Sequence, residues 1–202
     1  MQRALSSLMR RAGKETEIKL AVASAPALRR RLRALGFRPL GPRQRERNAV
    51  WDTPKRLLKK RGCLLRLRTV GGRGWIPFKG PRQRQQGFKV RTEWEAEVAP
   101  AASAEKILQA LGYQPVFRYE KFRTTYAQRG RRGGEVLLDE TPIGTYLELE
   151  GAPAWIGRVA RQLGYAPKNF ITKTYGELYL AWCRRRRQPP GNMVFRRRRT
   201  SL

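Results

Sequence analysis

The sequence predicts an α+β fold in which helices cover the outside of a closed antiparallel β-barrel with a charged interior. Its strand-like segments carry charges on alternate residues and apolar side chains between them. Turns such as Gly71-Gly72 and Gly133-Gly134 separate neighbouring segments, which favours antiparallel hairpins. Three helical segments each end in Leu-Gly-aromatic, a pattern in which the glycine accommodates a positive φ.

The first strand is predicted at residues 14–22, which contain the sequence ETEIKL. Successive side chains of a strand point to opposite faces, so Glu15, Glu17 and Lys19 share one face and apolar residues occupy the other. A single strand of this kind is explained equally well by an exposed sheet face. The repetition of the pattern in later strands therefore decides between the two interpretations.

Helices are predicted from their caps and from one apolar face each. Ser24 caps the first helix, Pro26 lies in its first turn, and Gly36 ends it. The other helices are predicted to begin at Ser103, at Pro153 and at about Thr172, the last one ending near Trp182.

The remaining strands are predicted at residues 43–51, 63–70, 75–80, 87–98, 116–127, 135–140 and 145–150. Several of them place like charges two residues apart: Arg66 and Arg68; Glu93, Glu95 and Glu97; Lys121 and Arg123; and Glu148 and Glu150. Like charges this close repel each other, so many such pairs are tolerated only where bound ions compensate them. Facing carboxylates form an oxygen-only site that suits Mg²⁺ or Mn²⁺. Paired arginines and lysines bind a polyphosphate, so the pattern predicts a metal–triphosphate site inside the barrel.

The residues that are missing exclude whole classes of enzyme. The chain contains no histidine, which removes Ser-His and Cys-His nucleophile systems and HExxH zinc sites. It also contains neither a GxxxxGK[ST] phosphate loop nor a GxGxxG dinucleotide turn. Any chemistry must therefore depend on carboxylates, lysines, arginines, tyrosines or a metal ion.

Composition divides the 202 residues into a barrel domain at 14–183 between two extensions. Residues 1–13 are predicted to be an N-terminal extension without the apolar core of a secretory signal. Residues 184–202 hold eight arginines and no acid and are predicted to be disordered. They would either contact nucleic acid, a membrane or another polyanion, or form a solvated tail without a partner. Cys63 and Cys183 are predicted to be free thiols, and no apolar run is long enough for a membrane span, so a cytoplasmic protein is expected.

Several short motifs together resemble the CYTH superfamily, the triphosphate tunnel metalloenzymes. In order they are Glu15-x-Glu17-x-Lys19, LRLR at 65–68, FKG at 78–80, R-x-E-x-E at 91–95, EKFRTTY at 120–126 and LDETPIGTYLELEG at 138–151. Each motif alone is weak, but six in this order cover about residues 14–182. The stretch LGYQPVFRYEKFRTTY further resembles the CyaB-like, or class IV adenylyl cyclase, branch. The resemblance implies an eight-stranded antiparallel tunnel that binds a triphosphate through Mg²⁺ or Mn²⁺.

The resemblance also implies roles for individual residues. Triphosphate oxygens would be held by Lys19, Arg66, Arg68, Lys79, Lys121 and Arg123, of which Lys19, Lys121 and Arg123 would also act in catalysis. Metal would be held by Glu15, Glu17, Glu148 and Glu150, with Asp139 as an additional acid. A supporting acidic pair would be Glu93 and Glu95, and a further basic residue near the last helix would be Lys173.

Two positions remain open at this point. Glu95 and Glu97 share a strand face, so the sequence does not choose between them. Pro77 interrupts a predicted strand and is expected to mark an edge or a bulge, which leaves the orientation of Lys79 open.

Three functions are compatible with this pattern. The first is metal-dependent hydrolysis of inorganic, nucleoside or thiamine triphosphate, and the second is cyclisation of ATP to cyclic AMP and pyrophosphate. The third is binding of polyphosphate or nucleotide without catalysis, against which the large acidic set argues. Cyclases of this class carry a His-Phe element before the first strand, whereas this chain has RRAGK there. Hydrolysis is therefore the favoured prediction.

Overall fold

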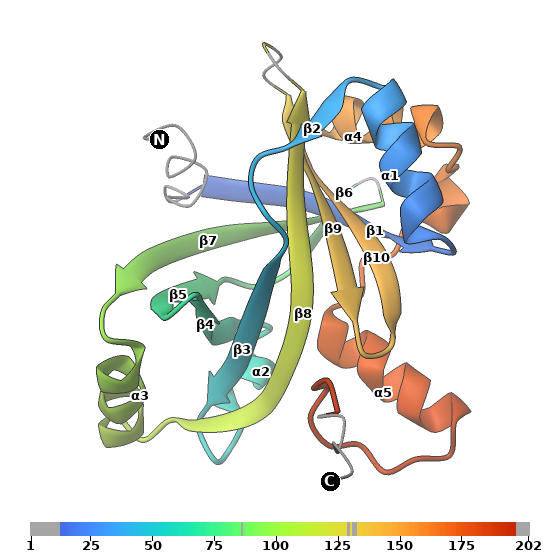
Figure 1. Ribbon diagram of the computed structural model, residues 1–202. Coiled ribbons are helices and arrows are strands. Elements are labelled where there is room, and N and C mark those ends of the chain that lie inside the picture. The colour runs from blue at the N-terminus through green and yellow to red at the C-terminus, as the bar shows by residue number, and fades with distance from the viewer. Residues whose placement is uncertain (1–12, 86, 129, 131–132, 197–202) are drawn as a thin grey trace, which may run out of the picture.

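The structure is a computed structural model that describes residues 13–85, 87–128, 130 and 133–196. Among these residues, eight strands close into an antiparallel barrel (Figure 1). Neighbouring strands follow in the order β1 (Gly13–Val22), β10 (Gly144–Gly151), β9 (Gly134–Thr141), β8 (Gln114–Gln128), β3 (Gln44–Asp52), β4 (Leu64–Val70), β5 (Arg73–Lys79) and β7 (Phe88–Val98). The barrel closes because β7 pairs back with β1, which places Arg91 opposite Glu15.

Short strands and helices lie outside this barrel. The strand β2 (Phe37–Pro39) pairs with β8, and β6 (Gln83–Gln85) pairs with β7. The helical segments are α1 (Ala25–Ala34), α2 (Leu57–Lys60), α3 (Ala101–Ala110), α4 (Pro153–Gln162), the 3₁₀ turn η3 (Pro167–Asn169) and α5 (Tyr175–Arg185). None of the helices in the described part of the chain has the length and apolar composition that a membrane span requires.

Helices α1 and α4 cover the outer face of β1, β9 and β10, and they lie on the same side of the barrel in Figure 1. Ile18, Leu138 and Leu149 point outward from these strands and pack with Leu32 of α1 and Ile156 of α4. All five side chains are fully buried, and burying each contributes about 1.5–3 kcal/mol. Because neighbouring residues in a strand point to opposite sides, this packing turns the charged residues into the barrel.

Helix α5 closes one end of the barrel. Thr174 caps it, and Glu177 completes a capping box with Thr174. The ring of Tyr175 lies 6.0 Å from that of Tyr119 on β8. Tyr119 shares a strand face with Lys121, so α5 packs against side chains that point into the barrel.

Most predicted helix boundaries are confirmed. Ser24 Oγ accepts a hydrogen bond from the N–H of Ala27 at 3.4 Å and so caps α1, and α4 begins at Pro153. The glycine that follows each of α1, α3 and α4 has a positive φ: 81° at Gly36, 80° at Gly112 and 80° at Gly164.

Two helix starts differ from prediction. Helix α3 begins at Ala101, so the prediction that Ser103 opens it is wrong; Pro100, which has an extended backbone, precedes the helix instead. Helix α5 begins at Tyr175 and not near Thr172, because the capping box at Thr174 sets its start.

The prediction that Pro77 marks an edge or a bulge is also wrong. Pro77 lies in a strand that pairs on both sides, and it faces Glu95 of β7. Between Phe78 and Trp75, β5 does not pair with β4, so the N–H that proline lacks is not needed there. The register of the β4–β5 pairing is the same before and after this gap, so there is no bulge. Lys79 therefore points into the barrel.

Disorder was the wrong prediction for residues 184–196. Helix α5 continues to Arg185, and the following residues return to β8. Met193 is only 1% exposed; its N–H donates to the Arg118 carbonyl at 3.0 Å, and its carbonyl accepts from the Glu120 N–H at 2.9 Å. Since β9 pairs with β8 only from Phe122 onward, this edge of β8 is open to the C-terminal segment. The predicted N-terminal extension, residues 1–12, and residues 197–202 of the tail lie outside the described residues.

Candidate active site

Inward-facing side chains line a cavity of about 80 Å³ in the barrel. Six are glutamates, at Glu15, Glu17, Glu93, Glu95, Glu148 and Glu150. Eight are basic, at Lys19, Arg66, Arg68, Lys79, Lys89, Arg91, Lys121 and Arg123. The structure thus brings together all the predicted site residues except Asp139 and Lys173.

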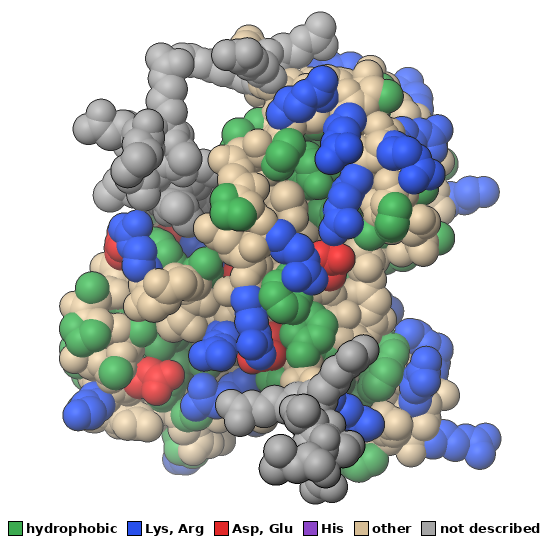
Figure 2. All heavy atoms as spheres, viewed as in Figure 1, with side chains coloured by type: hydrophobic (Ala, Val, Ile, Leu, Met, Phe, Trp, Pro, Cys, Tyr) green, Lys and Arg blue, Asp and Glu red, His purple; other side chains and the backbone are tan. Residues whose placement is uncertain are grey.

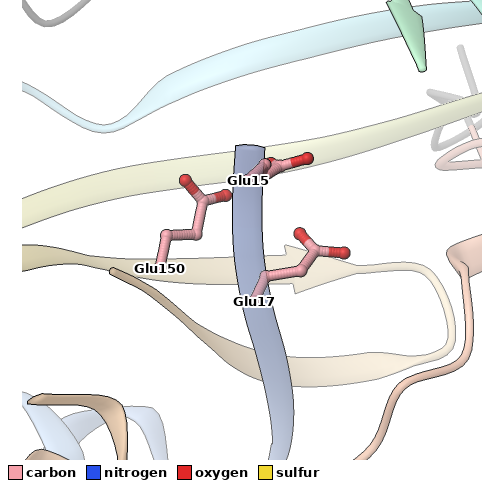
Figure 3. Close-up of side chains that lie close together, drawn as sticks. All are labelled: Glu15, Glu17 and Glu150. Carbon is pink, nitrogen blue, oxygen red and sulfur yellow. The ribbon is translucent and has the colours of Figure 1, made fainter. Parts of the chain in front are cut away.

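Three carboxylates from two adjacent strands form one acidic group. Glu15 and Glu17 come from β1, and Glu150 lies directly opposite Glu17 on β10. One oxygen from each carboxylate lies within 4.8 Å of the others (Figure 3). Hard oxygen donors at this spacing fit a Mg²⁺ or Mn²⁺ ion.

Ammonium groups surround these carboxylates. Lys79 Nζ lies 2.6 Å from Glu15 and 3.0 Å from Glu93. Lys19 Nζ lies 3.2 Å from Glu17, and Lys89 also donates to Glu17. Glu15, Glu17 and Glu93 are therefore each compensated by a base, as buried charges require.

This arrangement keeps Glu15 and Glu17 ionised. Burial alone would raise the pKa of Glu17, but Lys19 and Lys89 lower it well below its ordinary value. For Glu15, burial is likewise outweighed by Lys79, and the pKa is lowered. A carboxylate must be deprotonated to bind metal, so both groups are ready to do so.

Asp139 belongs to a second group of charges. Its carboxylate is fully buried and accepts hydrogen bonds from Lys121 at 2.9 Å, from Arg123 at 2.7 and 2.6 Å, and from the Tyr175 hydroxyl at 2.6 Å. Glu148 pairs with Lys19 at 3.1 Å and with Arg123. Asp139 and Glu148 therefore belong to a separate group with Lys121, Arg123 and Lys19 and not to the three-carboxylate group.

Glu46 is a site residue that the sequence prediction missed. It lies on β3, is buried, and pairs with Lys121 at 3.4 Å and Arg123 at 3.8 Å. Burial would raise its pKa, but Lys121 and Arg123 lower it strongly. The alternation of polar residues in Gln44-x-Glu46-x-Asn48 is the signal that would have identified it.

The part of the cavity wall formed by β4 and β7 resolves the choice between Glu95 and Glu97. Arg68 donates to both Glu95 oxygens at 3.0 Å inside the cavity. Glu97 pairs instead with Arg73 at the surface, where about a third of its side chain is exposed. Arg66 donates to the Tyr119 hydroxyl at 2.8 Å.

Lys173 lies near the C-terminal helix, as predicted, but outside the cavity wall. It is exposed and does not line the cavity, because the chain turns at Thr174 to begin α5 and the inward position goes to Tyr175. Lys89 and Arg91, which the prediction did not include, line the cavity instead. They begin the alternation that continues through Glu93 and Glu95 on β7, which is the signal that points to them.

Comparison with protein families gives one match over most of the chain, in which residues 13–175 fit the CYTH domain. No curated protein matches the chain.

Solved structures share the fold at low sequence identity. A Vibrio parahaemolyticus protein described as a candidate adenylate cyclase is 18% identical over 84% of this chain and 98% of its own, with a TM-score of 0.71. PH1819 from Pyrococcus horikoshii OT3 is 24% identical over 83% of this chain and 98% of its own, with a TM-score of 0.68. HpAC1 from Hippeastrum, whose description gives a dominant triphosphatase activity, is 17% identical over 87% of this chain and 97% of its own, with a TM-score of 0.61.

Proposed function

This chain belongs to the CYTH domain family, and we propose that it is a metal-dependent triphosphatase that binds its substrate inside the barrel. One observation carries the proposal: a cavity wall in which a three-carboxylate group faces a larger set of lysines and arginines. Eight basic and six acidic side chains line the cavity. A divalent cation on the carboxylates would leave this wall with an excess of positive charge, which suits a highly charged anion.

The metal would be held by Glu15, Glu17 and Glu150, whose donor atoms fit Mg²⁺ or Mn²⁺ in chemistry and spacing. Bound there, it would supply Lewis-acid stabilisation of charge on the phosphoryl oxygens. Lys19, Lys79 and Lys89 compensate these acids in the described structure. They would turn to phosphate oxygens once metal takes over that compensation.

Basic side chains on the other strands would hold the triphosphate. Arg66 and Arg68 project from β4, and Lys121 and Arg123 project from β8. Guanidinium groups bind phosphate oxygens through two parallel hydrogen bonds, and lysine acts as a compact charge. Asp139 and Glu46 fix Lys121 and Arg123 in place, so the donors need no rearrangement as charge develops on the transferred phosphoryl group.

Hydrolysis is favoured over cyclisation by the residues near the site. A cyclase must hold a ribose hydroxyl against the α-phosphorus, whereas a hydrolase needs only water. The cavity wall is almost entirely charged, and the chain has no histidine to assist a ribose hydroxyl. The dominant triphosphatase activity given for HpAC1 also supports hydrolysis.

The proposal is tested by separating the products formed from inorganic triphosphate, ATP and thiamine triphosphate with Mg²⁺ or Mn²⁺. We expect orthophosphate from at least one of these substrates and none when a chelator removes the metal. Cyclic AMP and pyrophosphate from ATP would identify a cyclase instead. Binding without any product would identify a non-catalytic binder.

A further inference from the structure

One arginine in the cavity wall has unused hydrogen-bonding capacity. Arg91 is 4% exposed, and its Nη2 donates to the carbonyl of Gly62 at 2.6 Å. Its Nε and Nη1 are buried without a hydrogen-bond partner. Leaving such donors unsatisfied is costly, so they point to a missing anionic ligand.

A second arginine lies beside it. Burial and the nearby charge of Arg82 together lower the pKa of Arg91. Arg82 donates to Glu177 at 2.9 Å, but the same carboxylate oxygen also accepts from Thr174 N at 2.6 Å and Thr174 Oγ1 at 2.7 Å. Arg82 therefore shares the Glu177 carboxylate oxygen with Thr174, and the negative charge near Arg91 is that of Glu17 and Glu15.

A basic segment, formed by the end of helix α2 and Arg61, leads to Gly62, whose carbonyl Arg91 binds. Lys59, Lys60 and Arg61 are exposed, and none of them forms an ion pair with an acid in the described part of the chain. Helix α2 is held in place because the Asp52 carboxylate accepts hydrogen bonds from the N–H groups of Leu58 at 2.9 Å and Lys59 at 3.0 Å.

Gly62, which follows Arg61, also lies against the segment that carries Arg82. A side-chain carbon at Gly62 would meet Pro81 Cα at 3.7 Å and Arg82 N at 3.9 Å. Arg91 in the cavity wall, Arg82 beside it and the exposed Lys59, Lys60 and Arg61 thus lie on segments that meet at Gly62. We call these five residues the basic rim.

Resting on the proposed function, we propose that the basic rim binds a phosphate group beyond the first three, so that the chain selects linear phosphate chains longer than triphosphate. The five side chains offer cationic hydrogen-bond donors only, and each suits a phosphate oxygen. A nucleoside would need acceptors for its hydroxyl and amino groups, which arginine and lysine lack. The rim therefore favours a fourth phosphate over a nucleoside.

Calorimetry on the metal-free protein tests this without any turnover. The dissociation constants of inorganic triphosphate, inorganic tetraphosphate and ATP are compared for the same protein. We expect tetraphosphate to bind about tenfold more tightly than triphosphate, the size of one charge-assisted contact at a partly exposed site. ATP should bind no more tightly than triphosphate.

Three variants locate the effect. The first variant is Arg82→Gln, and the second combines Lys59→Gln, Lys60→Gln and Arg61→Gln. In both, the affinity for tetraphosphate should fall close to that for triphosphate. Glu177→Gln should strengthen tetraphosphate binding, because glutamine keeps the capping box while Arg82 loses its anionic competitor. The control is a charge-matched triple variant at exposed positions on other elements, Lys106→Gln, Arg161→Gln and Lys168→Gln.

The proposal is overturned if the rim variants weaken all three ligands equally, which would indicate general attraction of anions. It is also overturned if only ATP binding changes, or if the metal-free protein binds neither phosphate chain. Because binding is measured without metal, these results do not depend on whether the protein is a hydrolase. The triphosphatase proposal fails separately, through the absence of orthophosphate.

Discussion

Charged side chains of the cavity wall are held in place by side chains of opposite charge, and this pairing determines the effect of substituting them. Arg68 donates to both oxygens of Glu95 and lies over the ring of Trp75, 5.3 Å from its centroid. Its Nε is buried without a partner. The side chain thus has a fixed position and one donor still available for a phosphate oxygen.

Arg68→Ala should lower kcat/KM for inorganic triphosphate and for ATP by a similar factor. Removing one partner of a buried charge pair costs about 2–5 kcal/mol, and the phosphate chain is common to both substrates. Arg68→Lys should restore only part of the activity, because lysine restores charge without the planar fork. A selective loss of ATP turnover in steady-state kinetics would show that Arg68 binds the nucleoside.

Lys89 makes the stability of the metal-free protein depend on pH. Burial lowers its pKa to about 8 against the opposing effect of Glu17, whereas an ordinary lysine titrates near 10.5. Between these values the unfolded chain binds more protons than the folded protein, so this lysine makes stability rise with pH.

Lys89→Met should remove that rise. The free energy of unfolding in urea, measured at about pH 7 and pH 9.5, should increase less with pH in the variant than in the unsubstituted protein. Lys106→Met, at an exposed lysine on α3, is the control and should leave the pH dependence unchanged. Equal pH dependence in Lys89→Met and the unsubstituted protein would contradict the assignment.

Most site residues were predictable because strand alternation follows from covalent geometry. Glu15, Glu17 and Lys19 required only that β1 have one apolar face. Their pairing partners were not predictable, because the barrel register decides which charges meet. The alternation did not place Lys173, which lies outside any strand at the turn before α5.

At the scale of elements, the C-terminal segment is an added edge of the barrel. Met193 packs with Tyr119 and Tyr179, and Phe195 lies with its ring 5.1 Å from that of Phe122. The segment therefore covers β8 beside the end of the cavity where Tyr119 lies. Its arginine-rich composition hid this role, since only two apolar side chains make the contact.

Met193→Ala should destabilise the fold by about 2–5 kcal/mol, the range for emptying a buried methionine site. The midpoint of urea unfolding measures the effect. Val194→Ala is the matched control, because Val194 is 41% exposed and should change stability little. Equal midpoints for the two variants would show that the segment does not contribute to the core.

Element boundaries were less predictable than the elements themselves. The start of α3 follows Pro100, although Ser103 is the better capping residue by type. The short strands β2 and β6 exist only because longer strands beside them offer open edges. Neither has an alternating pattern of its own long enough to recognise.

At the scale of the whole molecule, the net charge is divided unevenly. Together with the buried Glu46 and Asp139, the cavity wall contains eight acidic and eight basic side chains, so its formal charges cancel. The formal charge of +30 is therefore carried by the rest of the chain. Figure 2 shows lysine and arginine side chains spread over the side of the molecule where α1 lies. Such a field speeds the capture of anionic substrates and weakens as salt increases.

The most direct test of a metal-dependent triphosphatase is orthophosphate release from inorganic triphosphate by Glu17→Gln across a range of Mg²⁺ and Mn²⁺ concentrations. Glutamine keeps the shape of the side chain and removes the anionic ligand, so we expect a folded protein without metal-dependent turnover. Glu97→Gln, on the same face of β7 as Glu95 but paired with Arg73 outside the cavity, should retain activity. Full metal-dependent activity in Glu17→Gln would contradict the account.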